Sequence, residues 1–147
     1  HKLLEPFRLV VLQDAALSRR GTAVQGYGDS IGLPPDKIEK AVFNFSNAPL
    51  GIAVVASLKP EEAIPEVEQT LAVGACCLSV LNAALASGWG ANWITGWAAF
   101  DHPFLQANMG LKPEEYVAGF IFVGTPKSEP ADRKRPDLTA ITTGVET

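Results

Sequence analysis

The residues from Glu66 to Gly96, EVEQTLAVGACCLSVLNAALASGWGANWITG, decide the fold of this chain. Apolar side chains recur at helical spacing from Val73 onward, which predicts one long helix over residues 66 to 87 that ends on Gly88. Because this helix is apolar around most of its circumference, it should lie inside the protein or in a subunit interface. Residues 91 to 95 then predict a short strand.

Short apolar strands and helical segments alternate on both sides of this stretch. Strands are predicted over residues 7 to 13, 51 to 58 and 116 to 124. Helices are predicted briefly after Asp14 (with a loop up to residue 35), from a cap at Asp36 to residue 47, and from a cap at Asp101 to Gly110. After Pro126 the chain turns polar and contains further prolines. We therefore expect residues 1 to 147 to form a single α-and-β domain, with residues 127 to 147 as an extended C-terminal arm.

Composition excludes several classes of function. The net charge of −4 argues against nucleic acid as the main partner, because binding to phosphates needs clustered Lys and Arg. The two cysteines, Cys76 and Cys77, are adjacent, so they are expected to be small buried hydrophobes and not a disulfide or a zinc site. Such cysteine usage fits a reducing compartment, and the apolar region 71 to 97 is interrupted too often for a membrane span. These features predict a cytoplasmic protein.

Side chains that could do chemistry are scarce. The two histidines, His1 and His102, are not in a metal-ligand spacing, and there is no G-x-S-x-G nucleophile motif. The segment from Gly90 to Gly96 is more informative, since a strand end between glycines can offer backbone amides and the Thr95 hydroxyl to a planar ligand. A helix stop with a tight turn beside a tryptophan-rich core explains the same residues, and the pattern leaves both interpretations open.

Taken in order, six segments resemble the nitroreductase family, in particular its minimal-length branch. In the first segment, HKLLEPFR is followed by the strand LVVL, and the clearest match is GWGANWITG, which resembles the family pattern G-(F/Y/W)-G-x-x-W-x-(S/T)-G. The order and spacing of the segments carry the resemblance, more than any one of them. The six segments start at His1, Lys40, Pro65, Gly88, Val117 and Arg133.

The resemblance implies an α+β, FMN-dependent nitroreductase-like fold with a central, mainly antiparallel sheet flanked by helices. It also implies a homodimer with two FMN sites at the subunit interface. The cofactor contacts that carry over are His1, Trp93, Ile94, Thr95, Arg133 and Arg135, with Arg suited to phosphate geometry. Ile94 stands where other members have Arg. A region linked to the nicotinamide cofactor matches Ala83, Ala84, Leu85, Ala86, Ser87 and Gly88.

The activity implied is that of an NAD(P)H-dependent FMN oxidoreductase. The flavin would carry the chemistry, passing a hydride from NAD(P)H to nitroaromatic, quinone or similar acceptors by a ping-pong mechanism, so no catalytic side chain and no metal are expected. The family begins with a helix whose Arg-Arg-Ser type motif grips the FMN phosphate, and we expect such residues to precede His1. The alternatives are a non-catalytic flavin-binding or flavin-sequestering protein of the same fold, and a structural or interaction domain without flavin.

Overall fold

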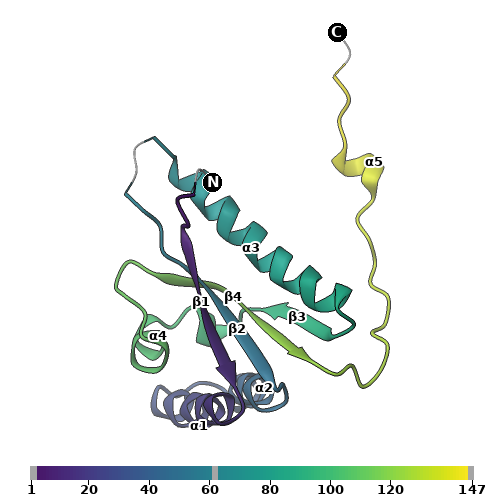
Figure 1. Ribbon diagram of the computed structural model, residues 1–147. Coiled ribbons are helices and arrows are strands. Elements are labelled where there is room, and N and C mark those ends of the chain that lie inside the picture. Colours follow the sequence, from purple (N-terminus) through teal and green to yellow (C-terminus); the bar gives the residue numbers. More distant parts are fainter. Residues whose placement is uncertain (1–2, 61–62, 146–147) are drawn as a thin grey trace.

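The computed structural model describes residues 3–60 and 63–145, and its centre is a four-stranded sheet (Figure 1). The strands are β1 (Phe7–Gln13), β2 (Leu50–Ala56), β3 (Gly90–Ile94) and β4 (Tyr116–Gly124). They lie in the order β1-β2-β4-β3, and every neighbouring pair is antiparallel. The predicted fold class, an α+β structure with an antiparallel sheet flanked by helices, is confirmed.

Helices cover both faces of this sheet. On one face lie α1 (Ala15–Ser30), α2 (Pro35–Ser46), the short 3-10 helix η1 (Trp97–Ala99) and α4 (His102–Met109). On the other lies α3 (Glu66–Ala86), and a one-turn helix, α5 (Leu138–Ile141), interrupts the C-terminal arm (Figure 1). We call these the α1–α2 face and the α3 face.

The alternation of side chains along β4 divides the core into two clusters. Phe120 and Phe122 point to the α1–α2 face, where both pack edge-on against Phe45 of α2 with ring centroids 5.2 and 5.3 Å apart. Ile121 and Val123 point to the α3 face. Since β2 and β4 are covered on both sides, they are apolar at nearly every position.

Several elements match the sequence prediction closely. The strands over residues 7–13 and 116–124 have the predicted bounds. Asp101 caps α4 by accepting a hydrogen bond of 2.9 Å from the backbone N–H of Phe104. The same helix ends at Gly110, whose φ of 62° is in the left-handed region.

The prediction for the segment after Asp14 is wrong. The segment after Asp14 is a continuous helix of 16 residues, not a short helix and a loop. Gly21 and Gly28 lie two turns apart on α1, and an added Cβ there would lie 2.7 Å from Ser46 Oγ and 2.9 Å from Ile38 Cγ1. These glycines therefore serve close helix packing and not a turn.

The predicted cap of α2 is also wrong. Asp36 lies inside the first turn, while Pro34 occupies the N-cap position and no side chain caps the helix. Pro34 is extended at the N-cap position, and Pro35 at the first helical position has no N–H that would need a partner.

α3 packs against the sheet along one narrow stripe, in which Gln69, Val73 and Cys77 are buried. The rest of this apolar helix is more open: Leu71 is 68% exposed and Leu78 is 49% exposed. By length and composition alone α3 could cross a membrane, which for one helix is weak evidence of a span. Because Leu71 and Leu78 are exposed, α3 is less buried in this chain than the sequence predicts for a core helix.

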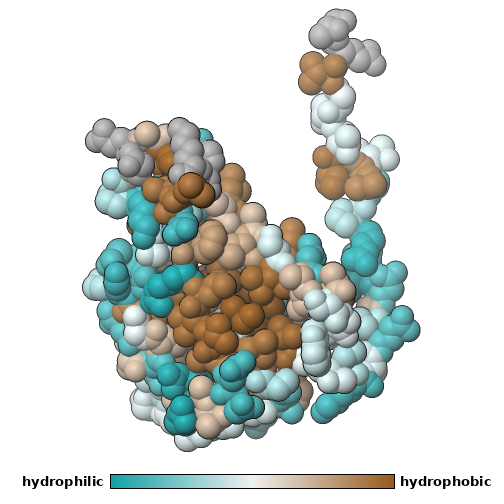
Figure 2. All heavy atoms as spheres, viewed as in Figure 1, coloured by the Kyte–Doolittle hydropathy of each residue, from teal (hydrophilic) through white to brown (hydrophobic). Residues whose placement is uncertain are grey.

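An apolar surface continues from α3 onto the neighbouring strands. Leu9 and Val11 of β1 point to the α3 face beside Val54 and Ile52 of β2, and they are 47% and 55% exposed. Figure 2 shows a broad hydrophobic area at the centre of the side turned to the viewer. An uncovered apolar area of this kind is typical of a surface that meets another protein surface.

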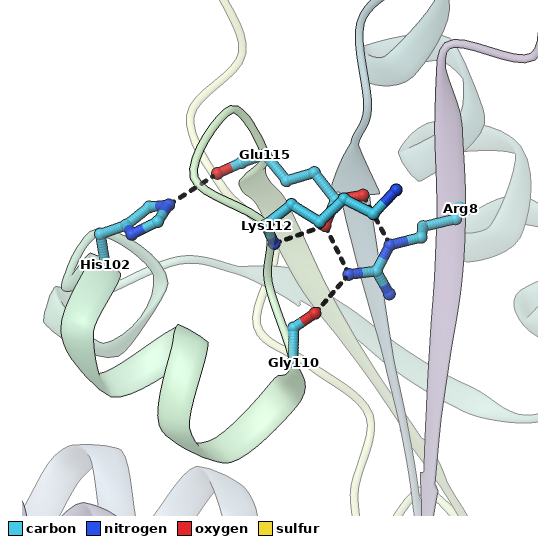
Figure 3. Close-up of polar contacts among 5 residues, drawn as sticks. All are labelled: Arg8, His102, Gly110, Lys112 and Glu115. Carbon is cyan, nitrogen blue, oxygen red and sulfur yellow. Dashed lines mark hydrogen bonds and ion pairs between the residues drawn. The ribbon is translucent and has the colours of Figure 1, made fainter.

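An ion pair with a buried carboxylate ties β1 to the turn before β4 (Figure 3). Arg8 donates from Nε and Nη2 to the two carboxylate oxygens of Glu115, over 2.8 and 2.6 Å. The backbone N–H of Lys112 also donates to Glu115, and Arg8 donates to the carbonyl of Gly110. The hydrogen bond from Arg8 lowers the pKa of Glu115 to about 2, against the opposing effect of burial.

Replacing this carboxylate should destabilise the fold in a pH-dependent way. Since the folded-state pKa of Glu115 falls from 4.5 to about 2, Glu115→Gln should lower the free energy of unfolding at pH 7 by about 3 kcal/mol. The ion pair's contribution is present above pH 4.5 and is lost as the pH falls toward 2. Urea unfolding of wild type and variant between pH 7 and pH 2 measures the difference.

The exposed neighbour offers a control, since Glu114→Gln removes the same charge without the buried contacts. It should leave the unfolding free energy nearly unchanged. A Glu115→Gln deficit that stays constant down to pH 2 would contradict the assignment of the effect to the ionised pair.

Candidate functional site

A cavity of about 640 Å³ opens on the α1–α2 face, between α2 and the end of β3. We call it the α2–β3 cavity. Its size is in the range of small-molecule and cofactor sites. It is lined by Lys37, Lys40, Ala41, Asn44, Phe45, Asn92, Trp93, Ile94, Thr95, Gly96, Trp97, Ala98, Phe120, Phe122 and Arg133.

One wall of the cavity is a polar stripe of α2. Lys37, Lys40 and Asn44 follow one another at spacings of three and four residues, so they share a side of the helix. The adjoining side buries Ile38 and Phe45 against the core. Because the apolar side packs on the core, α2 is rotated so that the amide of Asn44 and the ammonium groups of Lys37 and Lys40 face the cavity.

The opposite wall is the end of β3 and the residues after it. Ile94 is paired with Phe120 and belongs to the core cluster of the α1–α2 face. Beyond it, Thr95 is exposed, and Gly96 has a φ of 81° with open space where a Cβ would stand. At Gly96 the backbone carries no side chain, and the amides of Thr95 and Gly96 are not part of the β3–β4 ladder, which ends at Ile94.

Apolar rings and positive charge are combined in the cavity. Phe120, Phe122 and Trp97 contribute aromatic surface, whereas Lys37, Lys40 and Arg133 contribute cations. Among the described residues, the lining includes no Asp, Glu, His or Cys. This donor set suits a flat, electron-rich ligand with an anionic group.

The structure brings four of the predicted cofactor residues to one place. Trp93, Ile94, Thr95 and Arg133 all line the α2–β3 cavity, although Arg133 comes from the distant C-terminal arm. Arg135 does not line it and is paired with Asp132 at 3.2 Å on the exposed arm. His1 lies outside the described residues. The roles of these residues in cofactor binding stay predictions.

The indole of Trp93 lies on the other face of the sheet. Trp93 is paired with Ile121, which belongs to the core of the α3 face. Its ring covers Gly119 of β4, where an added Cβ would overlap the indole, and its Nε1 donates to the carbonyl of Ala118 over 3.4 Å. Trp93 can therefore contribute backbone to the α2–β3 cavity, while its side chain packs on the α3 face.

The residues predicted for nicotinamide binding lie on that α3 face as well. Ala83, Ala84 and Ser87 line a second cavity of about 480 Å³, formed with β2 and β4 and bordered by Trp89. Within one chain the sheet separates this cavity from the α2–β3 cavity. The two predicted sites thus do not form one pocket in a single chain, and the nicotinamide assignment stays a prediction.

Sequence reasoning missed the contribution of α2. The spacing of Lys37, Lys40 and Asn44 was visible, but two lysines on an exposed helix side are usually only solvated. Lys40 also opened one of the segments that resemble the family, without being singled out. Trp97 was not singled out either, and it both packs on the core and lines the cavity.

The other reactive groups are engaged in structure. Burial raises the pKa of Cys77 to about 11, so its thiol stays protonated at neutral pH. The ring of His102 is 3.2 Å from the carbonyl oxygen of Glu115 (Figure 3). In the described part of the chain no three His, Cys, Asp or Glu residues are grouped as metal ligands.

The fold and the cavity together define a class of protein. It is an α+β protein with a site at the end of β3 that is lined by aromatic rings and cations. The family model "Nitroreductase family" matches residues 1–125, and the chain belongs to this family. A protein of Escherichia coli strain K12 named "Putative NAD(P)H nitroreductase YdjA" is 28% identical over 127 residues, which are 86% of this chain and 69% of that protein. A Haemophilus influenzae protein named "Putative NAD(P)H nitroreductase" is 29% identical, over 85% of this chain and 68% of that protein.

Solved structures show the same fold. A nitroreductase-like family protein from Bacillus cereus superposes with a TM-score of 0.79 at 20% identity, covering 100% of this chain and 77% of that one. An FMN-dependent nitroreductase from Clostridium difficile R20291 gives a TM-score of 0.66 at 16% identity, covering 97% of this chain and 78% of that one.

The position of the Trp93 indole predicts a strict requirement for glycine at residue 119. Gly119→Ala should lower the free energy of unfolding by about 2 kcal/mol, because the ring must leave its place on β4 or the strands must separate. The matched control is Gly26→Ala on α1, where nothing lies within 4 Å of an added Cβ; it should be neutral or stabilise by up to about 1 kcal/mol.

Urea unfolding followed by tryptophan fluorescence measures both effects. The Gly119 variant should also show a shifted native emission maximum, as the indole moves. Equal stability and equal emission for the two alanine variants would show that Trp93 does not pack as described.

Proposed function

We propose that this chain is an FMN-dependent oxidoreductase that transfers a hydride from NAD(P)H, through the flavin, to nitroaromatic, quinone or similar acceptors. The observation that carries the proposal is the α2–β3 cavity, in which an aromatic floor, a thin strand end and three cations are combined. The family membership and the names of the relatives support the same chemistry.

The residues of the cavity fit a flavin mononucleotide. The rings of Phe120 and Phe122 give an apolar floor suited to a flat heterocycle. Backbone amides at Thr95 and Gly96 are free of the strand ladder and would bind a polar ring edge. Arg133 suits the bidentate geometry of a phosphate, and the lysines of α2 would neutralise charge on the same ligand.

The reaction assigned to the site needs little from the side chains. When bound, FMN supplies hydride transfer in both half-reactions. This chain's residues hold and orient the ring, and its apolar floor limits the access of water. We propose that the two half-reactions follow a ping-pong scheme, in which NAD(P)⁺ leaves before the acceptor enters the same slot.

We also propose that the chain works as a homodimer whose interface is the α3 face. Leu71 and Leu78 of α3 are exposed in the single chain, as are Leu9 and Val11 of β1. All four are large apolar side chains that the single chain leaves uncovered. Every described residue from Thr125 to Val145 is exposed, so the arm is available to contact a second copy (Figure 1).

Removal of one lysine charge tests the cofactor site. The purified protein should bind FMN and quench its fluorescence, and Lys40→Gln should weaken this binding about tenfold, because a charge-assisted contact is lost. The matched control is Lys127→Gln, a residue near the start of the arm that does not line the α2–β3 cavity. It should bind FMN as wild type does.

Anaerobic visible spectra then separate the candidate functions. The FMN-loaded protein should bleach on addition of NADPH or NADH and regain its colour with a nitroaromatic or a quinone. A yellow protein that does not bleach supports the flavin-sequestering alternative. A colourless protein that takes up no added FMN overturns the proposal.

A charge in the α3 face tests the dimer. Leu71→Asp should convert a dimer to a monomer at micromolar concentration, because an unpaired carboxylate would be buried in an apolar interface. Ile31→Asp is the control: Ile31 is 45% exposed at the end of α1, away from α3. Light scattering that finds a stable monomer for the wild type, or a dimer for all three proteins, would contradict the assignment of this face.

A further inference from the structure

Tyr27 on α1 contacts both ends of η1, the 3-10 helix that follows the cavity wall. At one end its ring stacks on Trp97, with centroids 6.3 Å apart and planes 13° from parallel. At the other end its hydroxyl donates to the carboxylate of Asp101 over 3.0 Å. Phe104 closes the cluster, with its ring centroid 5.5 Å from that of Tyr27 and 5.6 Å from that of Trp97.

Asp101 connects three elements: its Oδ1 joins α1 and α4, and its backbone N–H closes η1. Its Oδ1 accepts from Tyr27 of α1 and, over 2.9 Å, from the backbone N–H of Phe104 in α4. Its own backbone N–H donates to the carbonyl of Trp97 over 3.1 Å, which closes η1. The orientation of η1 is therefore fixed at its end by a carboxylate that Tyr27 holds.

The backbone of η1 continues directly into the cavity wall. The carbonyl of Gly96 accepts from the N–H of Ala99 over 3.1 Å, so the first turn of η1 includes the glycine that borders the cavity. The φ of Gly96 is 81°, and no atom lies within 4 Å of a would-be Cβ. Its backbone is placed between the β3–β4 ladder, which ends at Ile94, and the turn of η1.

α1, which carries Tyr27, also supports the opposite wall of the α2–β3 cavity, because it packs on α2. Gly21 and Gly28 of α1 allow close contact with α2 at Ser46 and Ile38. Lys37 and Lys40 lie beside Ile38 on α2 and line the cavity. Hence α1 contacts both sides of the site: α2 through glycines, and the strand end through Tyr27.

We propose that Tyr27 is a positioning residue of the cofactor site, whose hydroxyl sets the place of Thr95 and Gly96 through Asp101 and η1. This inference rests on the proposed function, because it assumes that a flavin occupies the α2–β3 cavity. Tyr27 is not among the residues that line the cavity, so it acts through the strand end.

A role in packing alone does not require the hydroxyl. Phenylalanine would fill the same space between Trp97 and Phe104 and keep the ring contacts. The hydrogen bond to Asp101 raises the pKa of Tyr27, as expected when a neutral hydroxyl donates to a carboxylate. The hydroxyl is thus used for a directed contact whose other partner caps α4.

Tyr27→Phe tests the proposal, because it removes one hydrogen bond and leaves the cap at Phe104 intact. FMN should bind more weakly, by up to about tenfold if the whole contribution of this hydrogen bond is coupled to binding. At saturating FMN the visible circular dichroism and the flavin midpoint potential should differ from those of wild type. Asp101→Asn is a second variant; its amide oxygen can still accept both hydrogen bonds, so it should lie between wild type and Tyr27→Phe.

Tyr116→Phe is the matched control, since that hydroxyl lies 3.5 Å from Thr70 Oγ1, near the start of α3. It should leave FMN affinity, spectrum and potential unchanged. If Tyr27→Phe lowers only the unfolding midpoint, and its saturated complex matches that of the control, the positioning role is wrong while the proposed function stands. If the wild type binds no FMN, the proposed function and this inference both fail.

Discussion

The alternation of side chains along β4 is the constraint on which the rest of this structure depends. Successive residues of a strand point to opposite faces, so Phe120 and Phe122 cannot share a face with Ile121 and Val123. β3 is paired to β4 in register and inherits this division: Ile94 faces α2 while Trp93 faces α3. A shift of one residue in that register would turn the indole toward the α2–β3 cavity and Ile94 toward α3.

Because of this division, the two faces of the sheet differ in what they leave open. The α1–α2 face is closed by three helices and η1, and it leaves one cavity where aromatic rings, cations and free backbone meet. The α3 face carries one helix, whose buried stripe is narrow, and its remaining apolar surface is open. The sheet therefore carries the proposed cofactor site on one face and the proposed subunit contact on the other, and a second copy on the α3 face would explain why α3 is apolar on two sides.

Local patterns were sufficient to predict most of the fold, and long-range packing explains where they failed. Residues 116 to 124 are apolar at nearly every position, and Asp101 precedes a helix with its cap, so both elements follow from neighbouring residues. Gly26, Tyr27 and Gly28 indicate a loop when considered alone, yet they lie in α1 because Gly28 gives space to Ile38 of another helix. For the site, the strand end was found from its glycines, whereas the lysines of α2 join it only through tertiary folding.

If the α2–β3 cavity holds the flavin, a crystal structure of the protein with added FMN should show it there. We expect density for the ring system over Phe120 and Phe122, with a ring edge at Thr95 and Gly96 and a cation from Lys37, Lys40 or Arg133 on the ligand. Flavin density on the α3 face instead, between Trp89 and the end of α3, would contradict it. So would an ordered α2–β3 cavity that contains only solvent at saturating FMN.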